Sequence, residues 1–247
     1  MIENDAGNSA EEHYRRARAS TNDEEALEAY RQAAELDPEF YKAVFGAGLM
    51  LQRLQRHGEA IREFTRVIDL QPRIAEAYYS RALSKRALGF SIPSLPDLEE
   101  AIALNPQYVD AIYLRGVAFK EMLLDEQAEA GFTEALAIDP SHPGAAHGLA
   151  TILSMAGAYE AAIRHFTTYI DNGPRMYGAF LLRGLAYYYI GQHTKAIDDL
   201  TEAIRIEPEN GATYLRRWGA YRALGMEKEA SADLETGKRL LSQNPKQ

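Results

Sequence analysis

Six prolines recur along the chain at a constant spacing of 34 residues, and each ends an amphipathic run such as "AAELDP" or "AIRIEP". They are Pro38, Pro72, Pro106, Pro140, Pro174 and Pro208. A fixed period of this length indicates a repeat architecture, in which each unit is one supersecondary element that buries its apolar face against its neighbours. Since the period runs through nearly all 247 residues, it leaves no room for a separate catalytic domain.

Placing each proline at position 32 predicts a single domain over residues 1–247. Its repeats are 7–40, 41–74, 75–108, 109–142, 143–176, 177–210 and 211–244, followed by a C-terminal tail at 245–247. Position 8 is small in every internal repeat, position 20 is Ala or Ser, and position 24 is large and apolar. This pattern predicts two antiparallel helices per repeat, because small residues let two backbones approach while large ones fill the surrounding space.

The ends of the predicted helices also follow the period. Glycine stands near position 15 in four repeats, where it can take the left-handed conformation that ends the first helix. The proline near position 32 ends the second helix, because the residue before a proline avoids the helical region.

The period and the pattern of small, Ala, aromatic and Pro positions resemble the tetratricopeptide repeat (TPR) family, most closely in "AFLLRGLAYYYIGQHTKAIDDLTEAIRIEPEN". The resemblance covers residues 7 to about 244. It implies an all-α fold, an α-solenoid built as a right-handed superhelix of seven helix-turn-helix units. It also implies that the first helix of each pair lines a concave groove and that the second faces outward.

In that family the groove is lined mainly by positions 2, 5, 9, 12 and 13 of the first helix. The residues that the resemblance places in a peptide-binding groove here are Phe45, Tyr79, Leu83, Arg86, Tyr113, Val117, Lys120, His147, Leu181, Tyr188 and Arg222. They form an aromatic and aliphatic stripe edged by cations. Such a stripe suits a partner peptide that has apolar side chains and acidic groups, the latter meeting Arg86, Lys120 and Arg222.

The composition excludes several function classes. A net charge of −9 argues against a nucleic-acid or membrane partner, since both need positive faces. The chain has no cysteine, which removes thiolate nucleophiles and thiolate metal sites. The first 20 residues do not resemble a secretory signal, and no apolar stretch approaches the length of a spanning helix. We therefore expect a cytoplasmic protein.

Catalytic and metal-binding motifs are absent from the sequence. No metalloprotease, nucleophile-elbow, P-loop or dinucleotide fingerprint occurs. The six histidines fall in different repeats or loops without paired ligand spacing. Acidic runs such as "NDEEALEAY" stand where helices begin, where carboxylates favour the helix dipole. The sequence therefore predicts no enzyme activity, no catalytic residues, no metal and no cofactor.

The predicted function is a non-catalytic scaffold or adaptor that binds a partner segment in its groove. Self-association into a homo-oligomer through the ends or the outer face is an alternative. Two further alternatives are a substrate-selecting region of a larger assembly and helical-repeat RNA binding, which the acidic charge opposes.

Three local features carry expectations of their own. "SAEE" at residues 9–12 has the pattern of a capping box that starts the first helix at Ser9. Trp218 is expected in a capping core, with Gly237 making room for its indole. In "SIPSLPDLEEAI", Pro93 and Pro96 predict a helix that starts about one turn late, with Ser94 as its cap.

Overall fold

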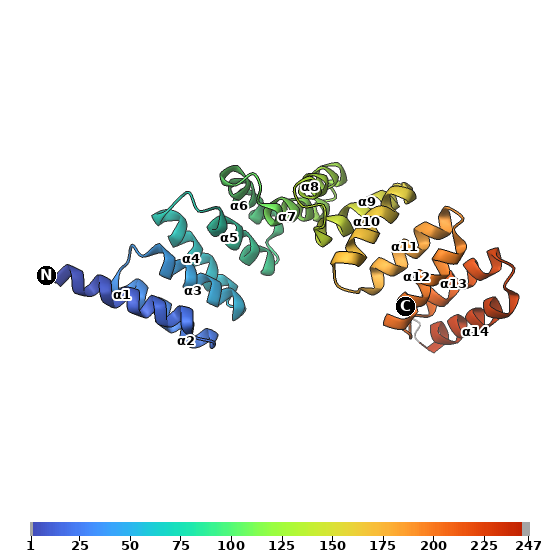
Figure 1. Ribbon diagram of the computed structural model, residues 1–247, viewed down its shortest axis with the longest axis horizontal. Coiled ribbons are helices and arrows are strands. Elements are labelled where there is room, and N and C mark those ends of the chain that lie inside the picture. The colour runs from blue at the N-terminus through green and yellow to red at the C-terminus, as the bar shows by residue number, and fades with distance from the viewer. Residues whose placement is uncertain (1, 244–247) are drawn as a thin grey trace. The chain divides into compact units, whose positions relative to one another are not determined.

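The computed structural model describes the backbone of residues 2–243 and the side chains of residues 9–243, so the tail predicted at 245–247 lies outside the described residues. Helices are the only regular elements in residues 2–243, and there are fourteen of them (Figure 1). They fall into two compact units, Met1–Leu124 and Asp125–Gln247, which are described separately.

The first unit contains seven helices. They are α1 Ile2–Ala19, α2 Asp23–Leu36, α3 Tyr41–Arg53, α4 His57–Leu70, α5 Ala75–Ala87, α6 Ser91–Leu104 and α7 Val109–Glu121. Each helix packs against the next, and α3 also contacts α5. The core between them contains Leu51, Phe64 and Val67, none of which is accessible to solvent.

The second unit contains the other seven helices. They are α8 Asp125–Ile138, α9 Pro143–Met155, α10 Tyr159–Asn172, α11 Tyr177–Tyr189, α12 His193–Ile206, α13 Gly211–Ala223 and α14 Glu227–Gln243. Successive helices again pack together, and α11 also contacts both α9 and α13. With fourteen helices in residues 2–243 and the fold of a tetratricopeptide repeat structure, the predicted all-α solenoid of seven two-helix units is confirmed.

Small residues permit close helix packing at Gly48, which is at the predicted position 8, and at Gly148, which is at position 6 and was not predicted. A Cβ atom on Gly48 would lie 2.6 Å from the Phe64 ring, and one on Gly148 would lie 2.6 Å from the Phe132 ring. Real Cβ atoms do not approach other atoms so closely, so the backbones of α3 and α9 need glycine at these points. The large side chain at position 24 of one helix thus fills the space beside its neighbour and requires a small residue there.

The first helices end as the sequence predicts. Gly89, Gly157, Gly191 and Gly225 all have positive φ, between 70° and 83°. Two non-glycine residues take the same conformation at the equivalent position, namely Gln55 with φ 59° and Leu123 with φ 61°. The turn geometry is therefore common to these repeats whether or not glycine is present to favour it.

The prediction of a late start for the helix at Pro93 is wrong. Helix α6 begins at Ser91, the same repeat position at which α4 and α12 begin, and Pro96 lies inside it. Pro93 is the third residue of the helix, where the backbone N–H would have no intrahelical partner in any case. Pro96 does remove one bond, at a cost of about 3 kcal/mol, yet the complete burial of Leu98 holds the helix in register with the array.

Asp97 and Ser94 do not cap this helix. The carboxylate of Asp97 pairs with Arg81 at 2.7 Å and with Lys85 at 2.8 Å, both on α5. The Ser94 hydroxyl donates to the Ser91 carbonyl oxygen at 2.5 Å. These side chains bind the neighbouring helix and their own first turn, so the sequence pattern of a cap was misleading here.

Two other local predictions are also wrong. Ser9 does not start the first helix, because α1 already begins at Ile2. Gly237 does not make room for the indole of Trp218, because a Cβ atom there would lie 2.8 Å from Leu215 Cδ2 and 3.0 Å from the Gly211 carbonyl oxygen. Gly237 instead permits the close approach of α14 to the start of α13.

Candidate functional site

The first helices of successive pairs lie side by side within each unit. In the first unit the Gln52 amide on α3 donates to the Ser80 carbonyl oxygen and the Ser84 hydroxyl on α5, both at 2.8 Å. In the second unit the hydroxyls of Tyr177 on α11 and Thr213 on α13 are 2.7 Å apart. Among the described residues, no two successive second helices of a unit make contacts as extensive as these first-helix contacts. The first helices therefore form the more closely packed layer of each unit.

The first unit contains seven of the eleven predicted groove residues. All but one are half-buried on the first helices, and Leu83 is 39% exposed. They are Phe45 on α3, Tyr79, Leu83 and Arg86 on α5, and Tyr113, Val117 and Lys120 on α7. Half-burial means that each side chain packs on its neighbours and still presents part of its surface. This layer thus offers aromatic and aliphatic groups to a partner.

The aromatic residues of this layer are held by ring contacts. The centroid of the Tyr79 ring lies 4.8 Å from that of Tyr108, and the centroids of Phe45 and Phe64 lie 5.6 Å apart. Burial, followed by the nearby Asp110 carboxylate, raises the pKa of Tyr79 to about 12. Its hydroxyl is therefore protonated at neutral pH and available as a hydrogen-bond donor.

Arg86 is engaged within the protein. Its guanidinium binds the Glu121 carboxylate through two contacts of 2.8 and 3.3 Å, and its side chain is largely buried. Burial alone would raise the pKa of Glu121, but hydrogen bonds from Ser91 and Arg86 lower it below its usual value. The pair is thus ionised at neutral pH, and an acidic partner would have to compete with Glu121 for Arg86.

The second unit contains the other four predicted groove residues. His147 on α9, Leu181 and Tyr188 on α11 are half-buried, whereas Arg222 on α13 is exposed. The His147 ring lies 5.0 Å from Tyr169 and 6.0 Å from Phe166, between centroids. Burial lowers the pKa of His147, so its imidazole is neutral at physiological pH.

A cavity of about 180 Å³ opens between α11 and α13 in the second unit. It is lined by Leu185, Tyr188, Tyr189, Leu215, Arg216, Trp218 and Gly219. Only Tyr188 of these belongs to the predicted groove set. Trp218, which was expected in a capping core, is half-buried and lines this cavity. The sequence did contain one signal of this cavity: Gly219 stands at position 9, where all six preceding repeats carry a larger residue.

Three arginines at position 7 of their repeats join neighbouring helices. Arg81, Arg183 and Arg217 each bind an aspartate 16 residues later through two hydrogen bonds of 2.7 to 3.0 Å. Each also donates to a threonine hydroxyl 16 residues earlier. These arginines are therefore structural and not available to a partner.

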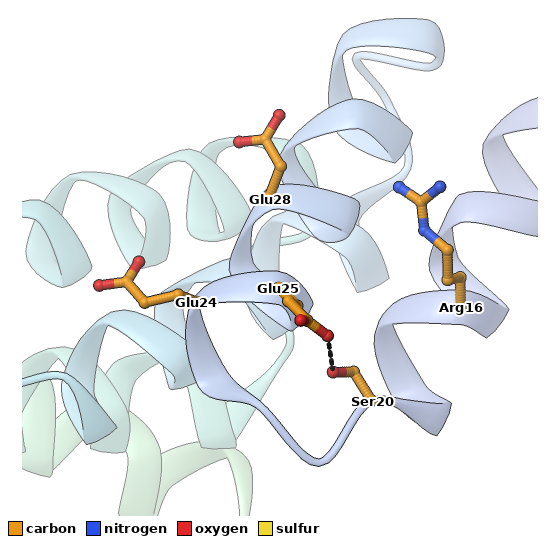
Figure 2. A pocket seen from close by; sticks show the side chains of 5 residues that line it. All are labelled: Arg16, Ser20, Glu24, Glu25 and Glu28. Carbon is orange, nitrogen blue, oxygen red and sulfur yellow. Dashed lines mark hydrogen bonds between the residues drawn. The ribbon is translucent and has the colours of Figure 1, made fainter.

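An acidic hollow of about 490 Å³ lies between α1 and α2 (Figure 2). Figure 2 shows Glu25 directed at Ser20, whose hydroxyl donates to it at 3.4 Å, while Glu24 and Glu28 point away from Arg16. Asn22 caps α2 by accepting hydrogen bonds from the backbone N–H groups of Glu24 and Glu25. The acidic run thus stands at a capped helix start, where it favours the helix dipole.

Neither a metal-ligating cluster nor a membrane-spanning helix occurs among the described residues. No group of three or more His, Asp or Glu side chains in residues 9–243 is arranged to hold a metal ion. No helix in the described part of the chain is long and apolar enough to cross a membrane.

Comparison with known proteins identifies one family. The model of the tetratricopeptide repeat matches residues 12–73 and 147–211, which together are just over half of the chain. No curated protein matches the chain.

Several solved structures share the fold. A tetratricopeptide repeat protein from Parabacteroides merdae is 21% identical, with a TM-score of 0.65 over 94% of this chain and 93% of that one. PilF of Pseudomonas aeruginosa is 18% identical, with a TM-score of 0.73 over 84% and 95%. YrrB, described as a TPR protein with an unusual peptide-binding site, is 20% identical, with a TM-score of 0.63 over 76% and 96%.

Proposed function

Since the chain belongs to the tetratricopeptide repeat family, we propose that it is a non-catalytic scaffold that binds an extended segment of a partner protein along its first helices. Proteins of this family are generally interaction scaffolds without catalytic activity. The peptide-binding site named for YrrB supports the proposal by likeness of fold. The proposed setting is the cytoplasm, which fractionation of cells that express the tagged protein would test.

The observation that carries the proposal is the row of partly exposed apolar and aromatic side chains on the first helices of each unit. Leu83 on α5 and Tyr189 on α11 are 39% and 57% exposed. Aromatic and aliphatic side chains held in place by their neighbours lose little entropy when a partner covers them. An extended segment would bury this surface, while its acidic groups would meet cations such as Arg222.

The proposal is tested with peptides selected from a random displayed library on the immobilised protein, whose affinities are then measured by fluorescence anisotropy. One variant carries Leu83→Glu and Thr151→Glu, which change one position-9 residue in each unit. Its matched control carries Leu36→Glu and Thr133→Glu on the second helices α2 and α8, where both side chains are exposed. Circular dichroism establishes that both variants fold.

We expect the selected peptides to bind the first variant at least tenfold more weakly and the control like the wild type. A charged residue in an apolar contact must lose its water, which is unfavourable. Peptides that lose affinity only for the control variant would show that binding takes place on the second helices, and the proposal would then be abandoned.

Self-association is a second candidate, favoured by one surface feature. Phe90 is 52% exposed and Ile92 is 60% exposed at the start of α6, beside the partly exposed Leu88. A cluster of exposed apolar side chains indicates a contact surface more often than a single exposed apolar side chain does. Light scattering over a wide concentration range tests this candidate, because a constant monomer mass would remove it.

A further inference from the structure

The seventh helix pair differs from the others at position 9 of its first helix. Gly219 stands there, while the six earlier repeats have Arg15, Leu49, Leu83, Val117, Thr151 and Leu185. The cavity of about 180 Å³ between α11 and α13 lies at this glycine. The absence of a side chain at Gly219 therefore coincides with a hollow in the layer of first helices.

Neither backbone conformation nor packing requires glycine at residue 219. Its φ lies outside the left-handed range, and a Cβ atom would meet Tyr188 at 3.6 Å, an ordinary van der Waals distance. Gly237 differs, since a Cβ atom there would lie 2.8 Å from Leu215. The glycine at 219 thus has no structural role of the kind that Gly237 has, and its effect is to keep the cavity open.

The walls of the cavity are aromatic and held in place. The Tyr189 ring stacks on Tyr159 with centroids 4.8 Å apart and planes 17° apart. The Tyr188 ring lies 5.2 Å from His193, and Trp218 forms another part of the wall. Rings fixed by such contacts form a preorganised site for a further ring, which favours offset or edge-to-face arrangements.

One cation lines this aromatic cavity, and a second lies over the Trp218 ring that forms part of its wall. Arg216 lines the cavity, and the Arg222 guanidinium carbon lies 5.4 Å from the centroid of a Trp218 ring. No carboxylate among residues 9–243 forms an ion pair with either arginine, in contrast to Arg183 and Arg217. The rim is therefore positive and suits a carboxylate next to the group that enters the cavity.

We propose that this cavity, the Trp218 pocket, binds one aromatic side chain of a partner peptide whose adjacent residue carries a carboxylate. The inference rests on the proposed peptide-binding function and names the chemistry of one subsite. A cavity of about 180 Å³ is smaller than the roughly 300 Å³ or more of a drug-sized site, and a cavity of about 150 Å³ can hold benzene. One ring therefore fills it, with the neighbouring carboxylate at Arg216 and Arg222.

The chain contains one tryptophan, so the fluorescence of Trp218 reports directly on the pocket. The probes are acetyl-Phe-Asp-amide, its uncharged counterpart acetyl-Phe-Asn-amide and its ring-free counterpart acetyl-Ala-Asp-amide. We expect saturable quenching by the first, with a dissociation constant on the order of 1 mM. We expect about tenfold weaker binding of the second and no saturation with the third. Equal responses to all three probes, or no response to any, would overturn the proposal.

Variants of the full chain test the same pocket from the protein side. Gly219→Leu introduces the residue found at position 9 of other repeats and should reduce probe affinity more than tenfold, whereas Gly219→Ala should change it less than threefold. Arg216→Gln should weaken binding of the Phe-Asp probe but not of the Phe-Asn probe. The matched control is Arg239→Gln on α14, which is exposed and should have no effect.

Different results would overturn the scaffold function and the Trp218 pocket. Library peptides that lose affinity for the Leu83→Glu and Thr151→Glu variant but bind Gly219→Leu like the wild type would leave the scaffold function in place and overturn the Trp218 pocket. Wild-type probe affinity in a folded Gly219→Leu protein would overturn it as well.

Discussion

The Arg183 guanidinium and the Asp199 carboxylate form a bidentate ion pair between α11 and α12. Nε donates to Oδ2 at 2.7 Å and Nη2 donates to Oδ1 at 2.8 Å. The same guanidinium donates through Nη1 to the Thr167 hydroxyl on α10 at 3.0 Å. The side chains of Arg183 and Asp199 are 15% and 7% exposed. One arginine thus joins three successive helices in a largely water-free setting.

Removing one partner of this pair should be costly. Asp199→Ala leaves a buried guanidinium without its carboxylate, and we expect the free energy of unfolding to fall by about 3 kcal/mol. The double variant Arg183→Met with Asp199→Leu should lose less than the single one, because no buried charge is left unpaired. Urea denaturation followed by circular dichroism measures both. Glu11→Gln, which breaks an exposed pair, is the control and should cost under about 1 kcal/mol.

The contact between Gly148 and Phe132 predicts a steric effect. Gly148→Ala places a Cβ atom where the Phe132 ring lies, so we expect destabilisation of about 1 to 3 kcal/mol. Adding Phe132→Leu should recover part of that loss. Gly178→Ala is the matched control, since nothing lies within 4 Å of its Cβ position, and it should be neutral or stabilising. Equal melting temperatures of Gly148→Ala and the wild type would contradict the packing described.

Leu123 predicts a gain in stability. It adopts φ 61°, which is unfavourable for a residue with a Cβ atom, and it is 84% exposed. Its side chain therefore gains little packing energy to offset the backbone strain. Leu123→Gly should stabilise the fold by about 1 kcal/mol. The reverse change at the equivalent turn, Gly89→Ala, should destabilise it by a similar amount, since that residue has φ 83°. Thermal unfolding of the two variants should therefore shift in opposite directions.

His147 predicts a pH dependence of stability. Burial lowers its pKa in the folded protein below the ordinary value of 6.5, so the unfolded chain takes up the proton first as the pH falls. Its contribution is then fully present above pH 6.5 and is lost as the pH drops through the folded pKa. His147→Gln should lose less stability between pH 7.5 and pH 5 than the wild type. Urea midpoints at the two pH values provide the measurement, and parallel losses would contradict the assignment.

Periodic features of the fold were predictable because they depend on local geometry repeated many times. The 34-residue spacing of Pro38 and its equivalents predicted the repeated two-helix fold, and glycines such as Gly89 marked the ends of first helices. Each of these signals is either a local backbone preference or a sequence period. Both can be recognised without knowing which side chains the neighbouring helix presents. Because the same proline and glycine signals recur at one spacing along the chain, together they predict the fold even though each one alone is weak.

Local signals failed where contacts between helices outweighed them. Pro96 reads as a helix start, yet it lies inside α6 because burial of Leu98 and the pairing of Asp97 with Arg81 hold that helix in the array. Ser9 reads as a cap, yet α1 begins at Ile2. At Pro96 a local preference of about 3 kcal/mol competes with packing energy summed over a whole helix.

The sequence by itself determined that this protein is a chain of helix pairs and which residues the first helices carry. Only the tertiary structure decided which of these residues have charges or surfaces that a partner could still contact. Arg86 is held by Glu121, Arg183 is held by Asp199, and Gly219 lies at a cavity whose aromatic walls come from both α11 and α13. The physical reason is that side chains from neighbouring helices neutralise a charge or leave a cavity open. The distances between such side chains depend on helix packing, which a period in the sequence does not give.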